Sequence, residues 1–293
     1  MPSWQGKSRG NTTGFRIFVW VLKHAGLRPA YLLLGFVAFY FFIFSGRAFH
    51  HQYIFFHKRL RFSSWKSWLS IYKNYYWFGQ TIIDKIVLMS GMEHPFRFEF
   101  EGEEHLREMV NQKKGGLLLS AHIGNWEIAG YLLKRLGTDI HIVMYDGEQE
   151  QIKNYLKRIT GEHTARIILI QEDLSHIYAI QEALEKNAFV CMHADRFLEG
   201  NKTRSAILLK ASALFPAGPF LLARTFQSPV SFVFAMKDRS TDYHFYASSS
   251  KIYAGSRENA VDEMLGDYCD AIENMIHKYP LQWYNYYDFW KGD

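Results

Sequence analysis

The chain has 293 residues, long enough to bury the core of one sizeable domain or two small ones. Its two cysteines exclude a disulfide framework, and Phe, Trp and Tyr make up 17% of the residues, which is high for a soluble protein. The net charge of +5 averages two different parts. Eleven of the 34 Lys and Arg residues, but none of the 29 Asp and Glu residues, lie in residues 1–83, which leaves 23 basic residues against 29 acidic ones in the remainder.

The basic first part contains an uncharged, apolar segment. The eighteen residues from Pro29 to Gly46, between Arg28 and Arg47, carry no charge. As a helix this segment would be about 27 Å long, close to the ~30 Å hydrocarbon core of a bilayer, and the flanking arginines can extend to the headgroups. We therefore expect a membrane-embedded helix, with a buried core helix or a helix lying in the interface as the alternatives.

Aromatic and basic residues then alternate from Phe49 to Phe78. A helix of this composition suits the bilayer interface, where rings lie at headgroup depth and cations face phosphates; packing of its aromatic stripe against the rest of the protein is the alternative. An anionic membrane, and not nucleic acid, is the expected polyanion because of the uncharged segment. We expect residues 1–90 to form a basic, aromatic, membrane-associated helical region.

After residue 90 short apolar strands alternate with helices, which predicts an α/β fold with a mixed, mostly parallel sheet flanked by helices. The expected strands are Arg97–Glu101, Gly116–Ala121, Ile140–Tyr145, Arg166–Ile170, Phe189–Ala194, Ala206–Leu209, Val230–Met236 and Tyr243–Ala247. The expected helices lie near residues 103–112, 126–136, 148–160, 173–187, 217–227 and 257–278. We expect residues 91–293 to form one catalytic domain.

The most informative stretch is LLLSAHIGNWEIAG, from Leu117 to Gly130. It predicts a buried strand, a tight turn that carries His122, and a helix that begins near Glu127. An imidazole takes a proton near neutral pH, and a carboxylate within reach can fix its tautomer. Gly124 permits a turn in which Glu127 reaches back to His122. A polar turn residue and a glutamate favoured by the helix dipole are the alternative interpretation of this pair.

A second group of polar residues follows the expected strand Phe189–Ala194. Asp195, Arg196 and Gly200 come after it along the chain. Ligands of α/β sheets bind at the carboxyl ends of strands, so we expect these residues to face the same end of the sheet as His122. His193, two residues before Asp195, is expected to be structural.

Several of these segments resemble one protein family. The string from His122 to Glu127 is similar to the H-x-G-N-W-E form of the H-x-x-x-x-D/E signature of the lysophospholipid acyltransferase superfamily, and within it to the bacterial lipid A biosynthesis (lauroyl/myristoyl-type) late acyltransferases. Asp195 and the Pro/Gly turn of residues 215–219 resemble the family's second conserved region, and Pro280-Leu281-Gln282-Trp283 resembles its closing P-x-Q-W motif.

Two features bear on the acceptor. Glu199-Gly200 and Thr203-Arg204-Ser205 resemble a split form of the E-G-T-R-S phosphate-recognition motif of glycerophosphate-lipid acyltransferases. Arg196 stands where the family often has Gln, and residues 284–290 are more aromatic than in many lipid A enzymes. These departures leave the expected reaction class intact and leave the acceptor open.

The resemblance implies an acyltransferase at the bacterial inner membrane, with its catalytic domain on the cytoplasmic side. It would move a fatty acyl chain from acyl carrier protein, or from coenzyme A, to a hydroxyl of a lipid acceptor. A lipid A precursor or related envelope lipid is the first expectation, and a lysophospholipid, amino-acid lipid or aryl-polyene lipid is the alternative. The residues implied are His122 as base, Glu127 as its orienting partner, and Gly124, Asn125, Asp195, Arg196, Gly200 and Arg204 around the substrate or the oxyanion.

No cofactor or metal is expected beyond the acyl thioester as co-substrate. The sequence has no Cys/His spacing of a zinc site, no Walker-type loop, no dinucleotide fingerprint and no G-x-S-x-G elbow. Two other classes of function compete with an enzyme. A lipid-binding membrane protein would not need His122 and Glu127, and a nucleic-acid-binding protein would show salt-dependent affinity for DNA or RNA.

Overall fold

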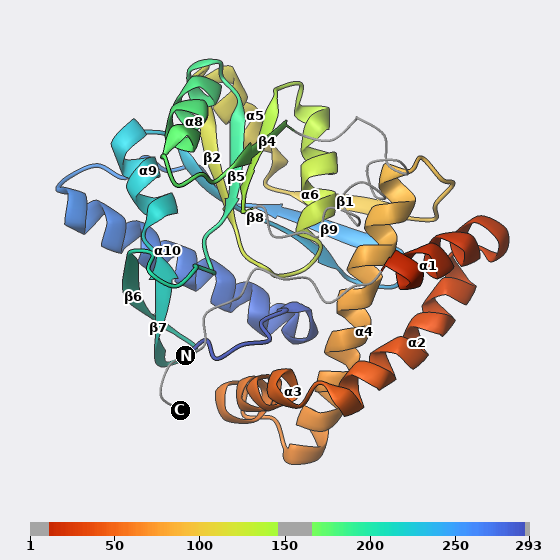
Figure 1. Cartoon of the computed structure of the whole chain (residues 1–293). Helices are drawn as coiled ribbons and strands as arrows, with labels where there is room; N and C mark the ends of the chain where they lie inside the picture. Colours follow the sequence, from red (N-terminus) through yellow and green to blue (C-terminus); the bar gives the residue numbers. More distant parts are fainter. Residues whose placement is uncertain (1–11, 146–165, 291–293) are drawn as a thin grey trace. The chain divides into compact units, whose positions relative to one another are not determined.

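The computed structural model describes residues 12–145 and 166–290, which form two compact units (Figure 1). Among the described residues, unit 1 contains residues 12–95 and 279–289, and unit 2 contains residues 96–145, 166–278 and 290. The expected helix at 148–160 lies outside the described residues. Residues 279–289, which the sequence analysis placed in the catalytic domain, belong to unit 1.

Unit 1 is built from helices. A buried hydrogen bond from the Tyr31 hydroxyl to the Asp84 carboxylate links two of them, α2 (Leu27–Phe44) and α4 (Ser64–Met89). The Ser63 side chain caps α4 by accepting a hydrogen bond from the Lys66 N–H at 3.4 Å, which satisfies a backbone donor that the helix leaves unpaired. The elements are α1 (Thr12–Ala25), α2 (Leu27–Phe44), α3 (Gly46–Tyr53), a π-helical segment (Ile54–Arg59), α4 (Ser64–Met89) and a 3₁₀ turn (Pro280–Gln282).

The C-terminal segment of unit 1 is fastened to α4 by Asn74. The Asn74 amide nitrogen, fully buried, donates to the carbonyls of Leu281 and Trp283, each at 3.0 Å. The Asn74 amide oxygen accepts a hydrogen bond from the Tyr286 hydroxyl at 2.8 Å. The closing P-x-Q-W motif, residues 280–283, therefore packs among the N-terminal helices of unit 1.

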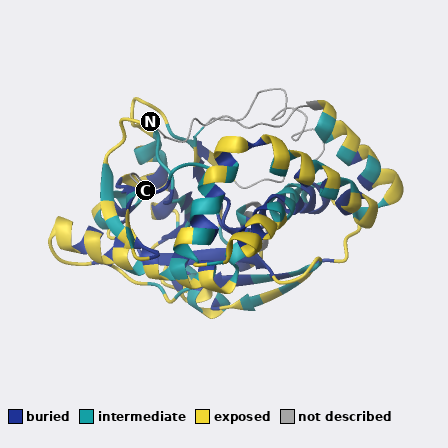
Figure 2. Ribbon diagram, turned by 90° about the horizontal axis from the view of Figure 1, so that it is seen from below, coloured by how far each residue is buried: buried dark blue, intermediate teal, exposed yellow. Residues whose placement is uncertain are grey.

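Large apolar side chains remain exposed on unit 1. Among the described residues, α2 is the one helix long and apolar enough to cross a membrane by length and composition, and 22% of its apolar window is buried. Phe36 is 70% exposed, and Trp65 of α4 is 80% exposed. The same helices carry long exposed stretches at the right of Figure 2. The other exposed apolar residues of α1, α2 and α4 are Ile17, Trp20, Leu32, Phe39, Tyr40, Ile43, Phe44, Trp68 and Leu69.

Unit 2 contains the α/β fold that the sequence predicts. Seven described strands form one sheet in the order β1-β9-β8-β2-β5-β3-β4, and β1 and β9 run opposite to the other five. The strands of this sheet are β1 (Arg97–Glu101), β2 (Gly116–Ser120), β3 (Ile140–Met144), β4 (Arg166–Leu169), β5 (Phe189–His193), β8 (Val230–Lys237) and β9 (Asp242–Ala247). β8 lies inside the sheet and is buried at every position.

The helices of unit 2 connect these strands in two directions. The connection from β2 to β3 runs toward the β4 edge, and those from β4 to β5 and from β5 to β8 run back. Because crossovers between parallel strands are right-handed, α6 (Trp126–Leu133) lies on one face, and α8 (Ser175–Glu185) and α9 (Gly218–Phe226) lie on the other. The helices are α5 (Glu103–Asn111), α6 (Trp126–Leu133) with a 3₁₀ turn (Lys134–Leu136), α8 (Ser175–Glu185), α9 (Gly218–Phe226) and α10 (Arg257–Lys278).

A separate hairpin differs from the prediction. β6 (Thr203–Leu208) pairs with β7 (Ala211–Pro216), a strand that the sequence analysis missed. Its two turn residues, Leu209 and Lys210, both have positive φ values, 49° and 64°. A turn with two positive φ values usually contains Asn or Gly. Neither residue occurs at positions 209 and 210, so the sequence does not predict this hairpin. Elsewhere the expected strands and described helices form, with ends shifted by a few residues.

The two cysteines are separate thiols. Burial raises the pKa of Cys191 and of Cys269 to about 12, so both stay protonated at neutral pH.

Replacing Asn74 with alanine removes three hydrogen bonds, so the carbonyls of Leu281 and Trp283 and the hydroxyl of Tyr286 lose this partner. We expect the free energy of unfolding to fall by about 2–4 kcal/mol, measured by urea unfolding in detergent with tryptophan fluorescence. Asn259→Ala, at an exposed position of α10, is the matched control and should change this free energy by less than about 0.5 kcal/mol. Equal stabilities of the two variants would contradict the anchoring role of Asn74.

Candidate active site

The turn after β2 holds His122 in a fixed backbone. β2 is a buried apolar strand, and its last carbonyl, on Ser120, accepts hydrogen bonds from the Tyr268 hydroxyl at 2.7 Å and the Ala194 N–H at 3.0 Å. Gly124 has φ +64°, and a Cβ there would lie 2.3 Å from the Ala235 carbonyl oxygen. Any side chain at 124 would therefore push the turn away from β8.

Asn125 is a structural residue of this turn. It is fully buried, and its N–H donates to the Ala235 carbonyl at 2.7 Å. Its side-chain amide donates to the Tyr243 hydroxyl at 3.1 Å, while its side-chain oxygen accepts the Ile128 N–H at 3.4 Å at the start of α6. The sequence analysis expected Asn125 near the substrate or the oxyanion. Its backbone N–H is not a donor to a reacting oxyanion, because it already donates to the Ala235 carbonyl.

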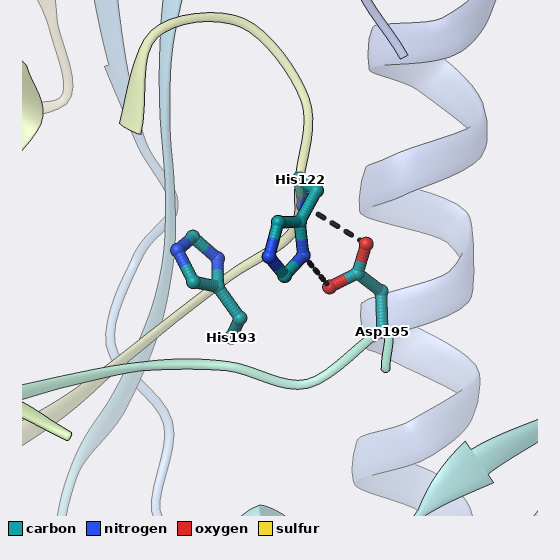
Figure 3. Close-up of side chains that lie close together, drawn as sticks. All are labelled: His122, His193 and Asp195. Carbon is teal, nitrogen blue, oxygen red and sulfur yellow. Dashed lines mark hydrogen bonds and ion pairs between the residues drawn. The ribbon is translucent and has the colours of Figure 1, made fainter. Parts of the chain in front are cut away.

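Asp195 lies directly against His122 (Figure 3). Its Oδ1 is 2.8 Å from His122 Nδ1, and its Oδ2 accepts the backbone N–H of His122 at 2.9 Å. The sequence analysis placed Asp195 at the substrate and gave the orienting role to Glu127. The structure brings Asp195 to the imidazole, whereas the side chain of Glu127 lies outside the described part of the chain.

The charge of Asp195 fixes the form of the imidazole. Burial by itself raises the pKa of this carboxyl, but the contacts with His122, together with Arg196 and His193, outweigh burial and hold the pKa below its usual range. An ionised carboxylate only accepts hydrogen bonds, so Nδ1 of His122 carries the hydrogen and the lone pair is on Nε2. The arrangement is that of a general base with an orienting carboxylate.

The rings of His193 and Trp126 lie beside the His122 imidazole. The His122 and His193 ring centroids are 4.4 Å apart with an interplanar angle of 33°, and the Trp126 ring lies 5.1 Å from that of His122. Burial lowers the pKa of His193 to about 3, and the nearby His122 adds to this lowering. His193 is therefore neutral at physiological pH. The sequence analysis missed its place in the site, although the spacing His193-x-Asp195 at a strand end was a signal for it.

The position of the site follows from the topology. β2 and β5 are neighbours, and Ser120 of β2 is in register with His193 of β5. The connection that leaves β2 and the one that leaves β5 depart in opposite directions along the sheet. This is a topological switch point, where the carboxyl ends of strands leave room for a ligand. Asp195 and His122 thus face the same end of the sheet, as the sequence predicts.

Three other predicted residues lie around the following loop and hairpin. Arg196 is close enough to lower the pKa of both Asp195 and His193. Gly200 has φ +90° in an exposed turn. Arg204 of β6 forms an ion pair of 3.8 Å with Asp262 of α10, so part of its charge is used within unit 2. Their expected contacts with substrate stay predictions.

The cluster has atoms that a metal ion could use. One ligand atom from each of His122, His193 and Asp195 lies within 4.8 Å of the others. Two imidazoles and a carboxylate are a common catalytic zinc set. The direct 2.8 Å contact between His122 and Asp195 is also the geometry of an imidazole oriented by a carboxylate, which needs no ion.

Comparison with known proteins identifies the class. A family model described as bacterial lipid A biosynthesis acyltransferase matches residues 70–291. The chain belongs to this family and is an acyltransferase. No curated protein matches the chain. Among solved structures, the crystal structure of the 1-acyl-sn-glycerophosphate acyltransferase PlsC from Thermotoga maritima is similar over 86% of this chain and 97% of that one, with 12% sequence identity and a TM-score of 0.38.

The lowered pKa of His193 makes stability depend on pH. The unfolded chain protonates this imidazole below about pH 6.5, whereas the folded chain does so only near pH 3. Between these values the unfolded state binds more protons, so the free energy of unfolding falls as the pH falls from 6.5 toward 3. We expect His193→Phe to flatten this dependence, measured by thermal unfolding at closely spaced pH values.

The control for this measurement is His277→Phe, which replaces a histidine 60% exposed on α10. It should leave the pH dependence as in the wild type. A slope that His193→Phe does not change would show that His193 is not the group responsible.

Proposed function

We propose that the protein transfers a fatty acyl chain from the thioester of acyl carrier protein to a hydroxyl of an envelope lipid, with His122 as general base. The observation that carries this proposal is the 2.8 Å contact between His122 Nδ1 and the buried Asp195 carboxylate, at the carboxyl end of neighbouring strands. Membership of the lipid A acyltransferase family supports the acyl transfer itself.

In the proposed reaction His122 both takes up and returns the one proton that is transferred. Nε2 takes the proton of the acceptor hydroxyl while the hydroxyl oxygen attacks the thioester carbonyl. When the carbon–sulfur bond breaks, the imidazolium returns the proton to the leaving thiolate. Asp195 keeps Nδ1–H oriented and stabilises the positive charge that His122 carries between these steps. The thioester is the co-substrate, and no further cofactor enters.

The proposal gives the remaining polar residues roles at the substrate. Arg196 is a fixed cation beside Asp195, suited to a phosphate of a lipid A precursor or of the phosphopantetheine arm. Gly124 bends the turn, and its N–H is the proposed donor to the oxyanion. Coenzyme A remains the alternative donor, and a lysophospholipid, amino-acid lipid or aryl-polyene lipid the alternative acceptor.

We further propose that unit 1 binds the cytoplasmic face of the bacterial inner membrane. Its exposed aromatic side chains on α2 and α4 would lie in the bilayer, and the absence of acidic residues from residues 1–83 suits anionic headgroups. A buried face of α2, which includes Tyr31 and Leu34, packs within unit 1, so the exposed face is the one that lipid would cover.

His122→Ala tests the reaction. We expect it to lower acyl transfer by roughly 10²–10⁴-fold, the usual contribution of general base catalysis. Detergent-purified protein receives radiolabelled lauroyl thioester of acyl carrier protein, or of coenzyme A, with total lipid from a Gram-negative envelope. The mass of the labelled product names the acceptor. Product formed equally by both proteins would remove His122 as base, and no product from the wild type would favour a non-catalytic lipid-binding protein.

Asp195→Asn and Glu127→Gln are the matched comparison for the orienting carboxylate. Each substitution removes a negative charge and keeps the size of the side chain. We expect Asp195→Asn to lower activity strongly, because an amide nitrogen placed against Nδ1–H would disfavour the required tautomer. Full activity of Asp195→Asn together with an inactive Glu127→Gln would return the orienting role to Glu127.

Replacing exposed aromatic residues tests the membrane surface. The triple variant Phe36→Ser, Tyr40→Ser, Phe44→Ser should lower binding to phosphatidylethanolamine/phosphatidylglycerol vesicles by at least about tenfold, because each ring contributes roughly 1.5–3 kcal/mol when buried. Cosedimentation after detergent removal measures it. The control, Tyr178→Ser with Ile207→Ser, removes exposed apolar side chains of unit 2 and should bind as the wild type. Equal binding by all three proteins would refute a bilayer contact through α2.

A further inference from the structure

His193 contacts the base but takes no part in the proton transfer described above. Its ring centroid lies 4.4 Å from that of His122, on the side away from Asp195 (Figure 3). The two rings are inclined by only 33°, so a face of one imidazole covers a face of the other. Trp126 meets both rings edge-on, at 5.1 Å from His122 and 5.6 Å from His193.

Asp195 does not by itself determine the plane of the base. Its two oxygens hold the backbone N–H and Nδ1 of His122, which fixes one edge of the imidazole. One hydrogen bond at Nδ1 holds the ring at a single point, so small combined rotations about the two side-chain bonds can still tilt the ring and displace Nε2. A second ring packed against the face of the imidazole opposes this tilt, since aromatic pairs prefer a defined geometry.

His193 is itself held in place. It ends β5 in register with Ser120, two residues before His122. The end of β5 and the turn that carries the base thus meet at this pair of rings. The Nδ1 atom of His193 is buried and has no hydrogen-bond partner among the described residues, so the contacts that hold this ring in the described part of the chain are those with the rings of His122 and Trp126.

We propose that His193 is a positioning residue, which holds the plane of the His122 imidazole so that Nε2 meets the acceptor hydroxyl. The proposal rests on His122 being the general base. The flat face of His193 sets the tilt, and the register of β5 with β2 keeps this face beside the turn. Because His193 stays neutral, the proton taken by His122 meets no like charge at 4.4 Å.

Two substitutions separate the flat face of the ring from its nitrogen atoms. His193→Phe keeps a flat ring without nitrogens, and His193→Gln keeps a hydrogen-bonding group without a ring. With the full chain in detergent and the lauroyl thioester assay, we expect His193→Gln to lower kcat by roughly tenfold to a hundredfold, the effect of misplacing a catalytic group by about 1 Å. The KM for the thioester should stay within about twofold, since positioning acts on the chemical step. His193→Phe should recover most of kcat.

The alternatives give other results. Equal loss in both variants with a raised KM would mean that a ring nitrogen binds substrate, which overturns the proposal. Unchanged kcat of His193→Gln, per molecule of folded protein by circular dichroism, would leave only a structural role. His122→Ala is run alongside: if it is inactive while His193→Gln has normal kcat, only the positioning role fails. If His122→Ala is fully active, the proposed base fails, and the role of His193 with it.

Discussion

The carboxylate of Asp195 is the constraint on which the site depends. A buried charge is costly unless it is paired and hydrogen-bonded, and here both oxygens are occupied by one residue, through the backbone N–H and Nδ1 of His122. The pair fastens the loop after β5 to the turn after β2. The two strands must therefore be neighbours in the observed register, and Gly124 must allow the turn to approach β8.

The same pairing separates the protonation behaviour of the two histidines. His122 faces a carboxylate that stabilises its charged form, whereas burial and the proximity of His122 keep His193 neutral. Two imidazoles less than 5 Å apart thus do different work: one is suited to exchange protons, and the other presents a neutral ring. Environment alone makes this difference, because the two side chains are chemically identical.

The sequence predicts local features of this protein better than their meeting in space. The apolar runs of β2 and β5 and the strand-end positions of His122 and Asp195 are visible because burial and turn chemistry are encoded within a few residues. The contact between these two residues joins positions 73 apart, and it depends on a strand order that periodicity does not specify. His193 was interpreted as structural for the same reason, because no local sequence feature shows that its ring meets that of His122.

The hairpin strand β7 was missed because Leu209 and Lys210 adopt positive φ without the residues that usually mark such a turn. Residues 279–289 were assigned to the sheet domain because chain order suggests it, yet buried polar bonds to Asn74 place them in unit 1.

That placement has a consequence for how the protein is made. On the ribosome, the helices of residues 12–95 emerge long before residues 279–289. The amide of Asn74 and the ring of Phe55 therefore lack Trp283 while the sheet is synthesised, although both contact it in the folded protein, Phe55 with ring centroids 4.8 Å apart. Unit 1 is consequently completed late in biosynthesis, and a chain that stopped before residue 279 would lack the buried hydrogen bonds to Asn74 even with its strands already paired.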